Sequence, residues 1–565
     1  MPSSTARGGL WGPASDGGDR HARAFAAFAQ AIGSAFVLTD DASLAPYRHS
    51  TSGPGNRPLA AIRPASTAEV SACVRIASRF GVPLYPISRG KNWGYGDARP
   101  AGPAQVIVDL GRMDRILDVN DTLAYAVIEP GVTQGALAQH LATAHPALWA
   151  DCTGAGPDVS VVGNMLERGF GHTAYGNRFQ TLCGLEVVLA DGRVLNTGFG
   201  HYAEAKARHT FPYGVGPYID GLFTQGNFGI VTRLGLWLMP APEAFELFVV
   251  SVSDDDFGPL IEAMRGLRLD GTVRSVVHIG NDMRLISSAM TFPWAAAPGQ
   301  SALPAAMRNA ICAKNDIGAW TAVGALMGTR ARVAADRKAV KRTLGRYRLR
   351  FVNERKLFLG EAVARQLRRG GRGAFLTRQL QAARGLFDFN RGVPSRRFLA
   401  GAYWRRQGGL PADFPDRCDP AADGCGLMWL APALPATGEA ARDLIARVSP
   451  ILAEHDFDLL ATLSFVNERS LAAVLTIAFD KASAEESARA ERCYAAMLEA
   501  AMAGGYVPYR VGTYSMDALA NGSSVFWDVV SALKTGLDPA GIIAPGRYQP
   551  NLDQPNRGPR DVASV

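Results

Sequence analysis

The chain has 565 residues, of which 47% are hydrophobic and 19% are charged, and its formal net charge is +8. A chain of this length exceeds what one hydrophobic core usually serves, so we expect two or more globular domains. No segment approaches the ~20 consecutive apolar residues of a membrane-spanning helix, which excludes that class of protein.

The positive charge is concentrated between Arg330 and Arg406, in a pattern typical of a solvated helical face. The arginines of this stretch include Arg365, Arg368, Arg369, Arg372, Arg378, Arg384, Arg396 and Arg397. Neither a zinc-ligand spacing nor a basic motif interleaved with aromatic residues accompanies them. The sequence therefore favours no nucleic-acid partner.

The N-terminal segment MPSSTARGGLWGPASDGGDR lacks the apolar core of a signal peptide. The seven cysteines are odd in number and include no CxxC pair, which is a poor disulfide framework and fits a reducing compartment. We expect residues 1–22 to form a flexible tail, and the protein to be cytoplasmic without contact to a membrane.

From Pro58 to Pro240 short β-rich runs alternate with helical stretches. The clearest unit has a strand at residues 60–62, a helix beginning at Thr67 in the spacing Thr-Ala-Glu-Val, and a strand over 82–87. This order predicts a βαβ unit. Further strands are expected at residues 106–110, 125–128, 185–189 and 229–239.

After residues 241–246 the pattern changes, which indicates a second domain. We expect a strand over FELFVVSV, a helix over 257–267, and two paired core strands over 459–466 and 471–479. The final segment GLDPAGIIAPGRY is too short for a domain of its own and is expected to dock onto another part of the chain.

Two glycine-rich segments are the candidates for ligand binding. The first, YPISRGKNWGYG at residues 85–96, follows a strand, and its backbone amides could form a concavity for an anionic diphosphate. The second runs from Cys152 to Phe179, around a short helix near 161–168. Two such loops favour a large extended cofactor; a structural turn and a set of tight connections are the alternatives.

Several segments, in order, resemble one known family. They are PISRGKNWGYGDARP, LERGFGHTAYGNRFQTLCGLEVVLADGRVLNTG, FPYGVGPYIDGLFTQGNFGIVTRLGLWLMP, GYVPYRVGTYSMD and LDPAGIIAPGRY. They are similar to the FAD-linked oxidoreductases typified by vanillyl-alcohol oxidase and the flavoprotein subunit of 4-cresol dehydrogenase (hydroxylating). The resemblance extends from about residue 45 to about residue 550 and is weakest between about 280 and 420.

The resemblance implies an α+β flavoenzyme with two domains. A PCMH-type FAD-binding domain would comprise residues 23–241 together with the returning segment 501–565, and residues 242–500 would form a cap over the flavin. The positions that the resemblance assigns to cofactor binding are Pro86, Ile87, Ser88, Arg89, Gly90, Lys91, Asn92, Trp93, Gly94, Gly163, Asn164, Gly169, Gly171, His172, Tyr175, Gly229, Ile230, Val231 and Arg547.

The residues that hold a phenolate in the phenol-oxidising members match Tyr95, Tyr509 and Arg510. Tyrosine hydroxyls donate to an oxyanion and an arginine stays charged, so the three suit that role. The acidic position near the flavin is Asn177, the cap glutamate appears as Thr462, and a His-His pair is replaced by Ala472 and Ala473.

Covalent attachment of the flavin is not expected. The position of a histidine anchor falls near Leu427, which cannot form the bond, and Tyr403 lies close to where a tyrosine anchor would be. His49 and His172 are the histidines nearest to the cofactor motifs, and a structural role for each is the more common case.

The predicted function is transfer of hydride from a small aromatic substrate, of the phenol or alcohol type, to FAD. Dioxygen or an electron-carrier protein would reoxidise the flavin, and the assembly would be a homodimer without a metal. The alternatives are a flavoenzyme of specialised metabolism with a non-phenolic substrate, and a flavin-binding protein that has lost catalysis.

Overall fold

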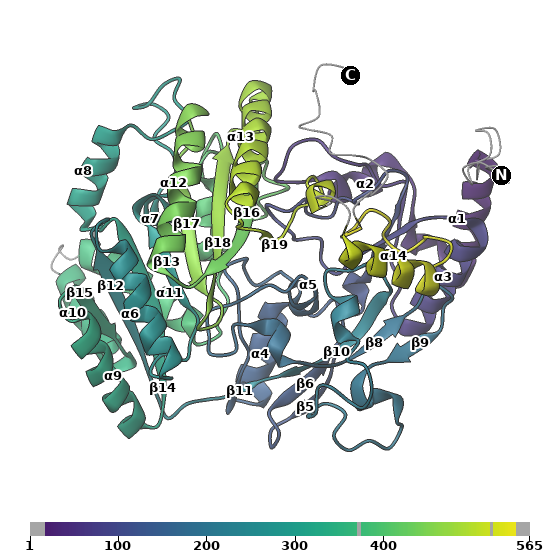
Figure 1. Cartoon of the computed structure of the whole chain (residues 1–565), viewed down its shortest axis with the longest axis horizontal. Helices are drawn as coiled ribbons and strands as arrows, with labels where there is room; N and C mark the ends of the chain where they lie inside the picture. Colours follow the sequence, from purple (N-terminus) through teal and green to yellow (C-terminus); the bar gives the residue numbers. More distant parts are fainter. Residues whose placement is uncertain (1–16, 370–373, 520–523, 550–565) are drawn as a thin grey trace, which may run out of the picture.

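The computed structural model describes residues 17–369, 374–519 and 524–549. Figure 1 shows two lobes: the N-terminal half of the chain and helix α14 (Val525–Leu537) form one, and the middle of the chain forms the other. Both lobes combine helices with sheets, so the predicted α+β class is confirmed.

A four-stranded sheet with the order β1-β2-β4-β3 lies at the start of the first lobe. Its strands are β1 (Val37–Leu38), β2 (Ala60–Ile62), β3 (Leu84–Ile87) and β4 (Val106–Asp109). Helix α3 (Thr67–Phe80) connects β2 to β3, which both pair in parallel with β4, so the predicted βαβ unit is confirmed. The helix begins at Thr67 as predicted, and Ser66 is its N-cap, because the Ser66 side chain accepts from the backbone N–H of Glu69.

A second, antiparallel sheet of the first lobe has the order β5-β6-β10-β8-β9. Its strands are β5 (Ile116–Asn120), β6 (Tyr125–Ile128), β8 (Leu182–Val188), β9 (Val194–Asn196) and β10 (Ile230–Trp237). Two short strands, β7 (Leu148–Trp149) and β11 (Met239–Pro240), form a separate antiparallel pair. The run predicted as one strand over 229–239 therefore divides at Leu238.

One eight-stranded sheet forms the centre of the second lobe, with the order β15-β12-β14-β13-β17-β18-β16-β19. Its strands are β12 (Ala244–Val252), β13 (Val277–Asn281), β14 (Trp320–Gly328), β15 (Arg348–Val352), β16 (Gly426–Pro435), β17 (Leu460–Phe465), β18 (Ser470–Phe479) and β19 (Pro508–Arg510). Strands β17 and β18 pair directly, as the sequence predicts. Strand β19 comes from the C-terminal segment and pairs with β16, which joins that segment to the sheet of the second lobe.

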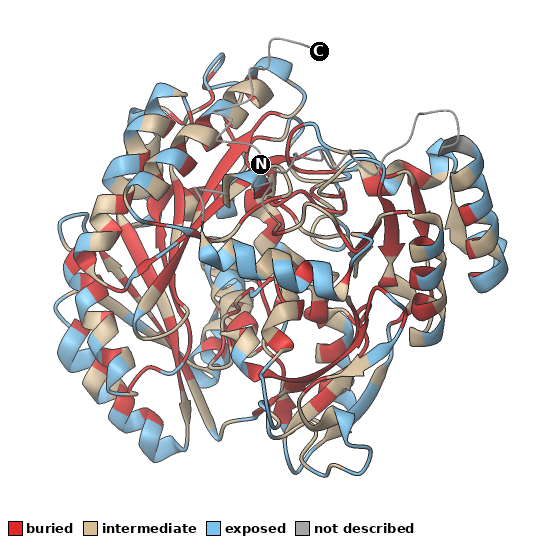
Figure 2. Cartoon of the chain, turned by 45° about the vertical axis from the view of Figure 1, so that its right-hand side comes forward, coloured by how far each residue is buried: buried red, intermediate tan, exposed pale blue. Residues whose placement is uncertain are grey.

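Helices surround these sheets. The remaining long ones are α1 (Gly17–Ile32), α2 (Asp41–Arg48), α4 (Gln134–Ala144), α6 (Phe257–Leu269), α7 (Asp282–Ala289), α8 (Ala305–Asn315), α9 (Arg330–Leu344), α10 (Glu354–Arg369), α11 (Ala374–Asn390), α12 (Gly438–Glu454) and α13 (Ala484–Ala503). A short helix α5 (Val161–Leu166) and a 3₁₀ helix η6 (Arg396–Tyr403) follow two of the loops that matter below. In Figure 2 the strands are mostly buried while the outer helix faces are exposed.

The prediction of a flexible tail over residues 1–22 is wrong for residues 17–22, which form the start of helix α1. Residues 1–16 lie outside the described residues, and helix α1 begins at Gly17. Ala24 and Phe28 of this helix are fully buried in the first core, together with residues of α3. Ala24 and Phe28 are four residues apart and therefore lie on one face of the helix, which packs against α3.

The C-terminal segment returns to the first lobe. The backbone N–H of Leu84 donates to the Ile542 carbonyl at 2.7 Å, and the N–H of Ala544 donates to the Leu84 carbonyl at 2.7 Å. The Lys534 ammonium is buried between Asp538, at 2.6 Å, and the carbonyls of Asn227 and Ile543. These contacts explain how a segment with little core of its own is held in place.

The arginine-rich stretch is engaged in ion pairs with acids of the chain. Arg384 lies 2.7 Å from a Glu354 oxygen and 2.9 Å from a Glu361 oxygen. Arg396 pairs with Asp158 at 2.8 Å. All seven cysteines are free thiols, and no helix within the described ranges is both long and apolar enough to cross a bilayer.

Candidate functional site

A cavity of about 640 Å³ lies between the two lobes and is lined by both. This volume is in the range of ligand-binding pockets, and its walls are mainly apolar with a few converging polar groups. The first lobe contributes the loop after β3, the loop around α5, and the start of β10. The second lobe contributes β13, α7, η6 and the central strands of its sheet.

Most of the site residues predicted from the sequence line this cavity. They are Pro86, Ile87, Ser88, Arg89, Gly90, Lys91, Asn92, Trp93, Tyr95, Gly163, Asn164, Gly169, His172, Gly229, Ile230, Val231, Tyr509, Arg510 and Arg547. They come from segments more than 400 positions apart in the sequence, and the fold brings them to one continuous wall.

Four predicted residues do not line the cavity: Gly94, Gly171, Tyr175 and Asn177. At Gly94 and Gly171 a side chain would collide with a neighbouring residue. Gly94 has φ +74°, and a Cβ there would lie 2.6 Å from the Trp429 ring. A Cβ at Gly171 would overlap the Asp151 carboxylate. These glycines therefore let loops approach neighbouring side chains closely.

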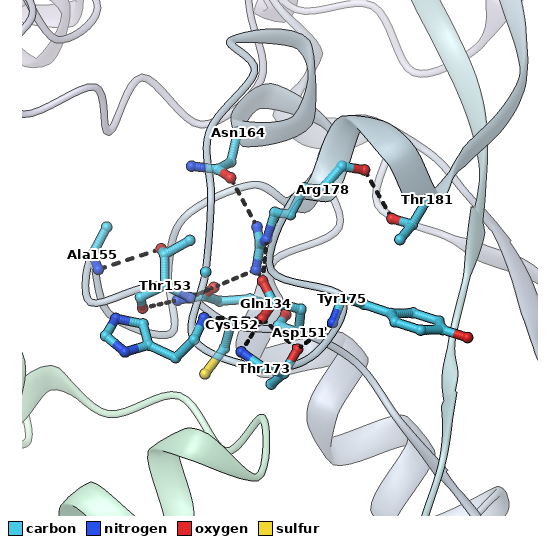
Figure 3. Close-up of polar contacts among 12 residues, drawn as sticks. Gln134, Asp151, Cys152, Thr153, Ala155, Asn164, Thr173, Tyr175, Arg178 and Thr181 are labelled. Atoms are coloured by element: carbon cyan, nitrogen blue, oxygen red, sulfur yellow. Dashed lines mark hydrogen bonds and ion pairs between the residues drawn. The ribbon is translucent and has the colours of Figure 1, made fainter. Parts of the chain in front are cut away.

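A buried polar network fixes the second glycine-rich segment (Figure 3). The Arg178 guanidinium donates through Nε to the Asp151 carboxylate at 2.7 Å, and through Nη1 to Asn164 Oδ1 at 3.1 Å. The same carboxylate accepts from the backbone N–H of Thr173 at 3.0 Å. Because the side chains of Asp151 and Arg178 are shielded from solvent and pair with each other, they hold Asn164 and the loop before Arg178 in one geometry.

The predicted Tyr95, Tyr509 and Arg510 converge at one end of the cavity. The Arg510 guanidinium carbon lies 4.3 Å from the centroid of the Tyr95 ring, and Arg510 Nη2 donates to Asn92 Oδ1. Burial raises the pKa of Tyr95 well above its ordinary value, and the neighbouring Tyr509 raises it further. Burial also raises the pKa of Tyr509, against the opposing effect of Arg510. Both hydroxyls therefore stay protonated and remain hydrogen-bond donors at neutral pH.

Glu167 supplies the negative charge at this end of the cavity. Its carboxylate lies between two guanidinium groups: it is 3.4 Å from Arg510 Nε and accepts from Arg547 Nη2. It also accepts from the Tyr548 hydroxyl at 2.8 Å. Two arginines around one carboxylate leave a net charge of about +1, which suits an anionic group of a ligand.

The opposite end of the cavity contains aromatic rings and one arginine from the second lobe. The rings of His172 and His278 stack with centroids 3.7 Å apart, and Phe389 lies 4.1 Å from His172. Burial lowers the pKa of His278 to about 4 and also lowers the pKa of His172, so both rings are neutral. Arg284, in the first turn of α7, completes this part of the wall.

Of the other positions that the sequence singled out, some line the cavity and some do not. Leu427 and Thr462 line the cavity, whereas Ala472 and Ala473 do not. Tyr403 is buried away from it and donates through its hydroxyl to Asp423 Oδ2 at 2.5 Å. This geometry does not present Tyr403 to a ligand in the cavity.

His49 is also outside the cavity wall; it directly follows α2. The wall residues that the sequence did not single out include Glu167, His278 and Arg284. Glu167 has a local signal, because it immediately precedes Arg168 and Gly169 at the end of a glycine-rich segment. His278 and Arg284 stand alone in a region without a motif.

The comparisons with known proteins agree with a flavin site. A family described as the FAD binding domain matches residues 58–198. The chain is 38% identical over 539 residues to the 1'-carboxy-chondrochloren decarboxylase of Chondromyces crocatus, covering 93% of this chain and 97% of that protein. It is 30% identical over 528 residues to the 4-cresol dehydrogenase [hydroxylating] flavoprotein subunit of Pseudomonas putida, covering 92% and 94%.

Two solved structures have the same architecture. The crystal structure of p-cresol methylhydroxylase with substrate bound superposes with a TM-score of 0.84, at 28% identity, over 95% of this chain and 98% of that one. The isoeugenol complex of 4-ethylphenol oxidase from Gulosibacter chungangensis gives a TM-score of 0.83, at 28% identity, over the same shares. The similarity therefore includes both lobes and the cavity between them.

Proposed function

Because this chain belongs to the family of PCMH-type FAD-linked oxidoreductases that includes the 4-cresol dehydrogenase flavoprotein subunit, we propose that it oxidises a small phenol-type substrate by hydride transfer. The observation that carries the proposal is the convergence of Tyr95, Tyr509 and Arg510 at one end of the cavity. These residues would bind the phenolic oxygen of the substrate.

FAD is the cofactor, and the cavity fits it. The wall includes backbone of the glycine-rich loop over residues 86–93 and of Gly163, where N–H groups can approach a diphosphate. The indole N–H of Trp93 is buried and has no hydrogen-bond partner among the described residues, so it remains for a ligand. When bound, FAD supplies the acceptor for a hydride.

Tyr95 and Tyr509 would each donate a hydrogen bond to the substrate oxygen, and Arg510 would stabilise its negative charge. The phenol would release its proton to solvent as it binds beside Arg510. The phenolate donates electron density through the ring to the opposite ring carbon, which favours loss of a hydride from the carbon attached there. The hydride carries its own electron pair, so no base is needed at that carbon. The position at which typical members of the family carry an acid is Asn177 in this chain, and Asn177 does not line the cavity, which agrees with a reaction that needs no base there.

The proposal is tested with the Arg510→Met variant of the FAD-loaded protein. With 4-ethylphenol as the substrate, we expect kcat/KM to fall by at least about 100-fold, because one charged donor to a developing oxyanion contributes this much. The FAD content should stay at the wild-type level. Wild-type kinetics in Arg510→Met would contradict the proposal, and Arg365→Met, on the exposed face of α10, is the matched control.

Reoxidation of the flavin completes the proposed cycle. We propose dioxygen or an electron-carrier protein as the acceptor. Rapid mixing of the reduced protein with dissolved dioxygen distinguishes the two, because an oxidase returns to the yellow form within its turnover time and a dehydrogenase does not.

A second candidate function is oxidative decarboxylation, since the relative from Chondromyces crocatus is named a decarboxylase. Loss of hydride beside the ring leaves that carbon electron-poor. If the next carbon bears a carboxylate, the bond to it can break: CO₂ leaves, and the bonding pair restores the aromatic phenolate as an alkenyl group forms. Arg284, a cavity cation that has no acidic partner in the described part of the chain, favours this candidate.

The two candidates differ in one product. With 3-(4-hydroxyphenyl)propanoate labelled with ¹³C at its carboxyl carbon, decarboxylation releases one labelled CO₂ for each substrate molecule oxidised. Oxidation without release of labelled CO₂ identifies simple hydride transfer.

A further inference from the structure

Arg284 is the one cavity arginine from the second lobe whose guanidinium has no acidic partner among the described residues. Its Nη1 donates to the Ser288 hydroxyl at 3.3 Å, within the same helix. The acid nearest in sequence, Asp282, is engaged with Arg308 through two hydrogen bonds of 2.7 and 2.6 Å. No carboxylate of the described chain therefore balances the charge of Arg284.

The surroundings of Arg284 are shaped to keep its guanidinium at the cavity. A Cβ at Gly401 would lie 2.5 Å from Arg284 Nη1, so the glycine leaves the room that the arginine occupies. Burial lowers the pKa of Arg284, and no neighbouring acid raises it again. A cation placed in such an environment is costly unless an anion joins it.

The neighbouring polar groups cannot act as that anion. His278 Nδ1 lies 2.8 Å from the Ser464 hydroxyl, and Nε2 lies 3.2 Å from the Gly171 carbonyl, an arrangement that fits a neutral ring. Strand β13 is flanked at Gly280 by Thr321 of β14 and Thr462 of β17, which offer hydroxyl groups rather than charge. The anion must come from a ligand.

A row of aromatic rings connects this end of the cavity with the tyrosine end. Phe170 lies 5.9 Å from Tyr509 and 6.1 Å from His278, measured between ring centroids. An aromatic ring held at Tyr509 would thus have an apolar wall beside it that leads toward His278 and Arg284. A molecule with a hydroxyl at one end and an acid at the other matches both ends.

We propose that Arg284 binds a carboxylate of the substrate, so that the substrate class is a phenol-type aromatic acid; this inference rests on the proposed function. A guanidinium binds a carboxylate through two parallel hydrogen bonds, which fixes both distance and orientation. Arg284 would thereby set the length of the side chain that places the carbon beside the ring for hydride loss.

The test compares two probe series by calorimetric titration of the FAD-loaded protein. One series is the 4-hydroxyphenylalkanoates of increasing chain length, and the other is the neutral 4-alkylphenols of matching length. We expect the wild type to prefer the acid at one chain length. In Arg284→Met the affinity for that acid should fall by about 10- to 100-fold while the alkylphenol is unaffected.

Two further variants keep the test decisive. Arg284→Lys retains charge without the planar fork and should lose only part of the preference, and Arg365→Met should match the wild type. An acid preference that survives in Arg284→Met, or is absent at every chain length, overturns the proposal. A loss of FAD from Arg284→Met with unchanged acid preference also overturns it, because Arg284 would then serve the cofactor.

Failure of this inference and failure of the proposed function give different results. If Arg284 binds no carboxylate but the chain oxidises phenols, alkylphenols still reduce the flavin. If the chain oxidises no phenol but Arg284 binds acids, no probe reduces the flavin while the affinity difference between wild type and Arg284→Met persists.

Discussion

Both ends of the cavity have arginine side chains in the wall, and among the described wall residues only the first end adds a carboxylate that pairs with them. At the first end Glu167 lies between Arg510 and Arg547 and accepts a further bond from Tyr548. At the second end Arg284 stands beside two neutral histidine rings. We call the first end the balanced end because a carboxylate of the chain offsets one of its two arginines there, which leaves a net charge of about +1. The second end, where no described carboxylate faces Arg284, is the unbalanced end.

The largest expected effect comes from breaking the balanced end. Glu167→Gln leaves the largely buried side chains of Arg510 and Arg547 without a carboxylate, and the free energy of unfolding should fall by about 3 to 5 kcal/mol. Urea denaturation measures this change. Glu243→Gln is the control, because the exposed pair of Glu243 with Arg330 should contribute less than about 1 kcal/mol. Equal denaturation midpoints for Glu167→Gln and wild type would show that the cluster needs no carboxylate.

The second prediction adds positive charge to the unbalanced end by lowering the pH. The pKa of His278 is about 4 in the folded chain, because burial disfavours the charged ring, while the unfolded chain has the ordinary value of 6.5. The unfolded state therefore binds the proton first. The contribution of this ring to stability is complete above pH 6.5 and is lost progressively as the pH falls toward 4.

The expected loss is up to about 1.4 kcal/mol for each pH unit in that range. His278→Asn should flatten the pH dependence of the free energy of unfolding by this amount between pH 6.5 and 5. His201→Asn, at an exposed position, should leave the slope as it is in the wild type. An unchanged slope in His278→Asn would mean that the ring is not kept neutral by burial.

The third prediction has the opposite sign from the first. Arg284→Met removes a charge that no described carboxylate balances, so the FAD-loaded protein without substrate should become more stable by about 1 kcal/mol. Thermal unfolding of FAD-loaded wild type and variant, side by side, measures the difference. A destabilisation as large as that of Glu167→Gln would indicate an acidic partner for Arg284 within the chain.

The smallest expected effect is at Asn177, which does not line the cavity. Asn177→Asp introduces the acid that typical members of the family carry, and kcat/KM with 4-ethylphenol should change by less than about twofold, since surface-like changes away from reacting groups have small effects. A gain well above that would show that residue 177 reaches the substrate in the loaded enzyme.

The difference between the two ends also explains what the sequence could predict. The first lobe has short runs of β-forming residues between loops marked by glycine and proline, so β6 (Tyr125–Ile128) was located to the residue and β3 nearly so. Tyr95, Tyr509 and Arg510 were found through the resemblance, because their motifs stand in order along the chain.

The unbalanced end left no such signal. The hydrogen bond between the His278 ring and the Gly171 carbonyl joins positions 107 residues apart. Whether an arginine is balanced depends on which acids surround it in space, and Asp282 beside Arg284 in sequence is paired elsewhere. The helix that begins at Gly17 was missed for a related reason, since its burial against α3 is a tertiary contact.

The central claim is that this chain removes a hydride from a phenol-type substrate held by Tyr95, Tyr509 and Arg510. The most direct measurement is the flavin absorbance after anaerobic mixing of the FAD-loaded protein with the 4-alkylphenols and 4-hydroxyphenylalkanoates. We predict rapid bleaching of the yellow colour by at least one of them in the wild type, and bleaching at least about 100-fold slower in Arg510→Met. Wild-type protein that stays yellow with every probe, or Arg510→Met that bleaches at the wild-type rate, would contradict the claim.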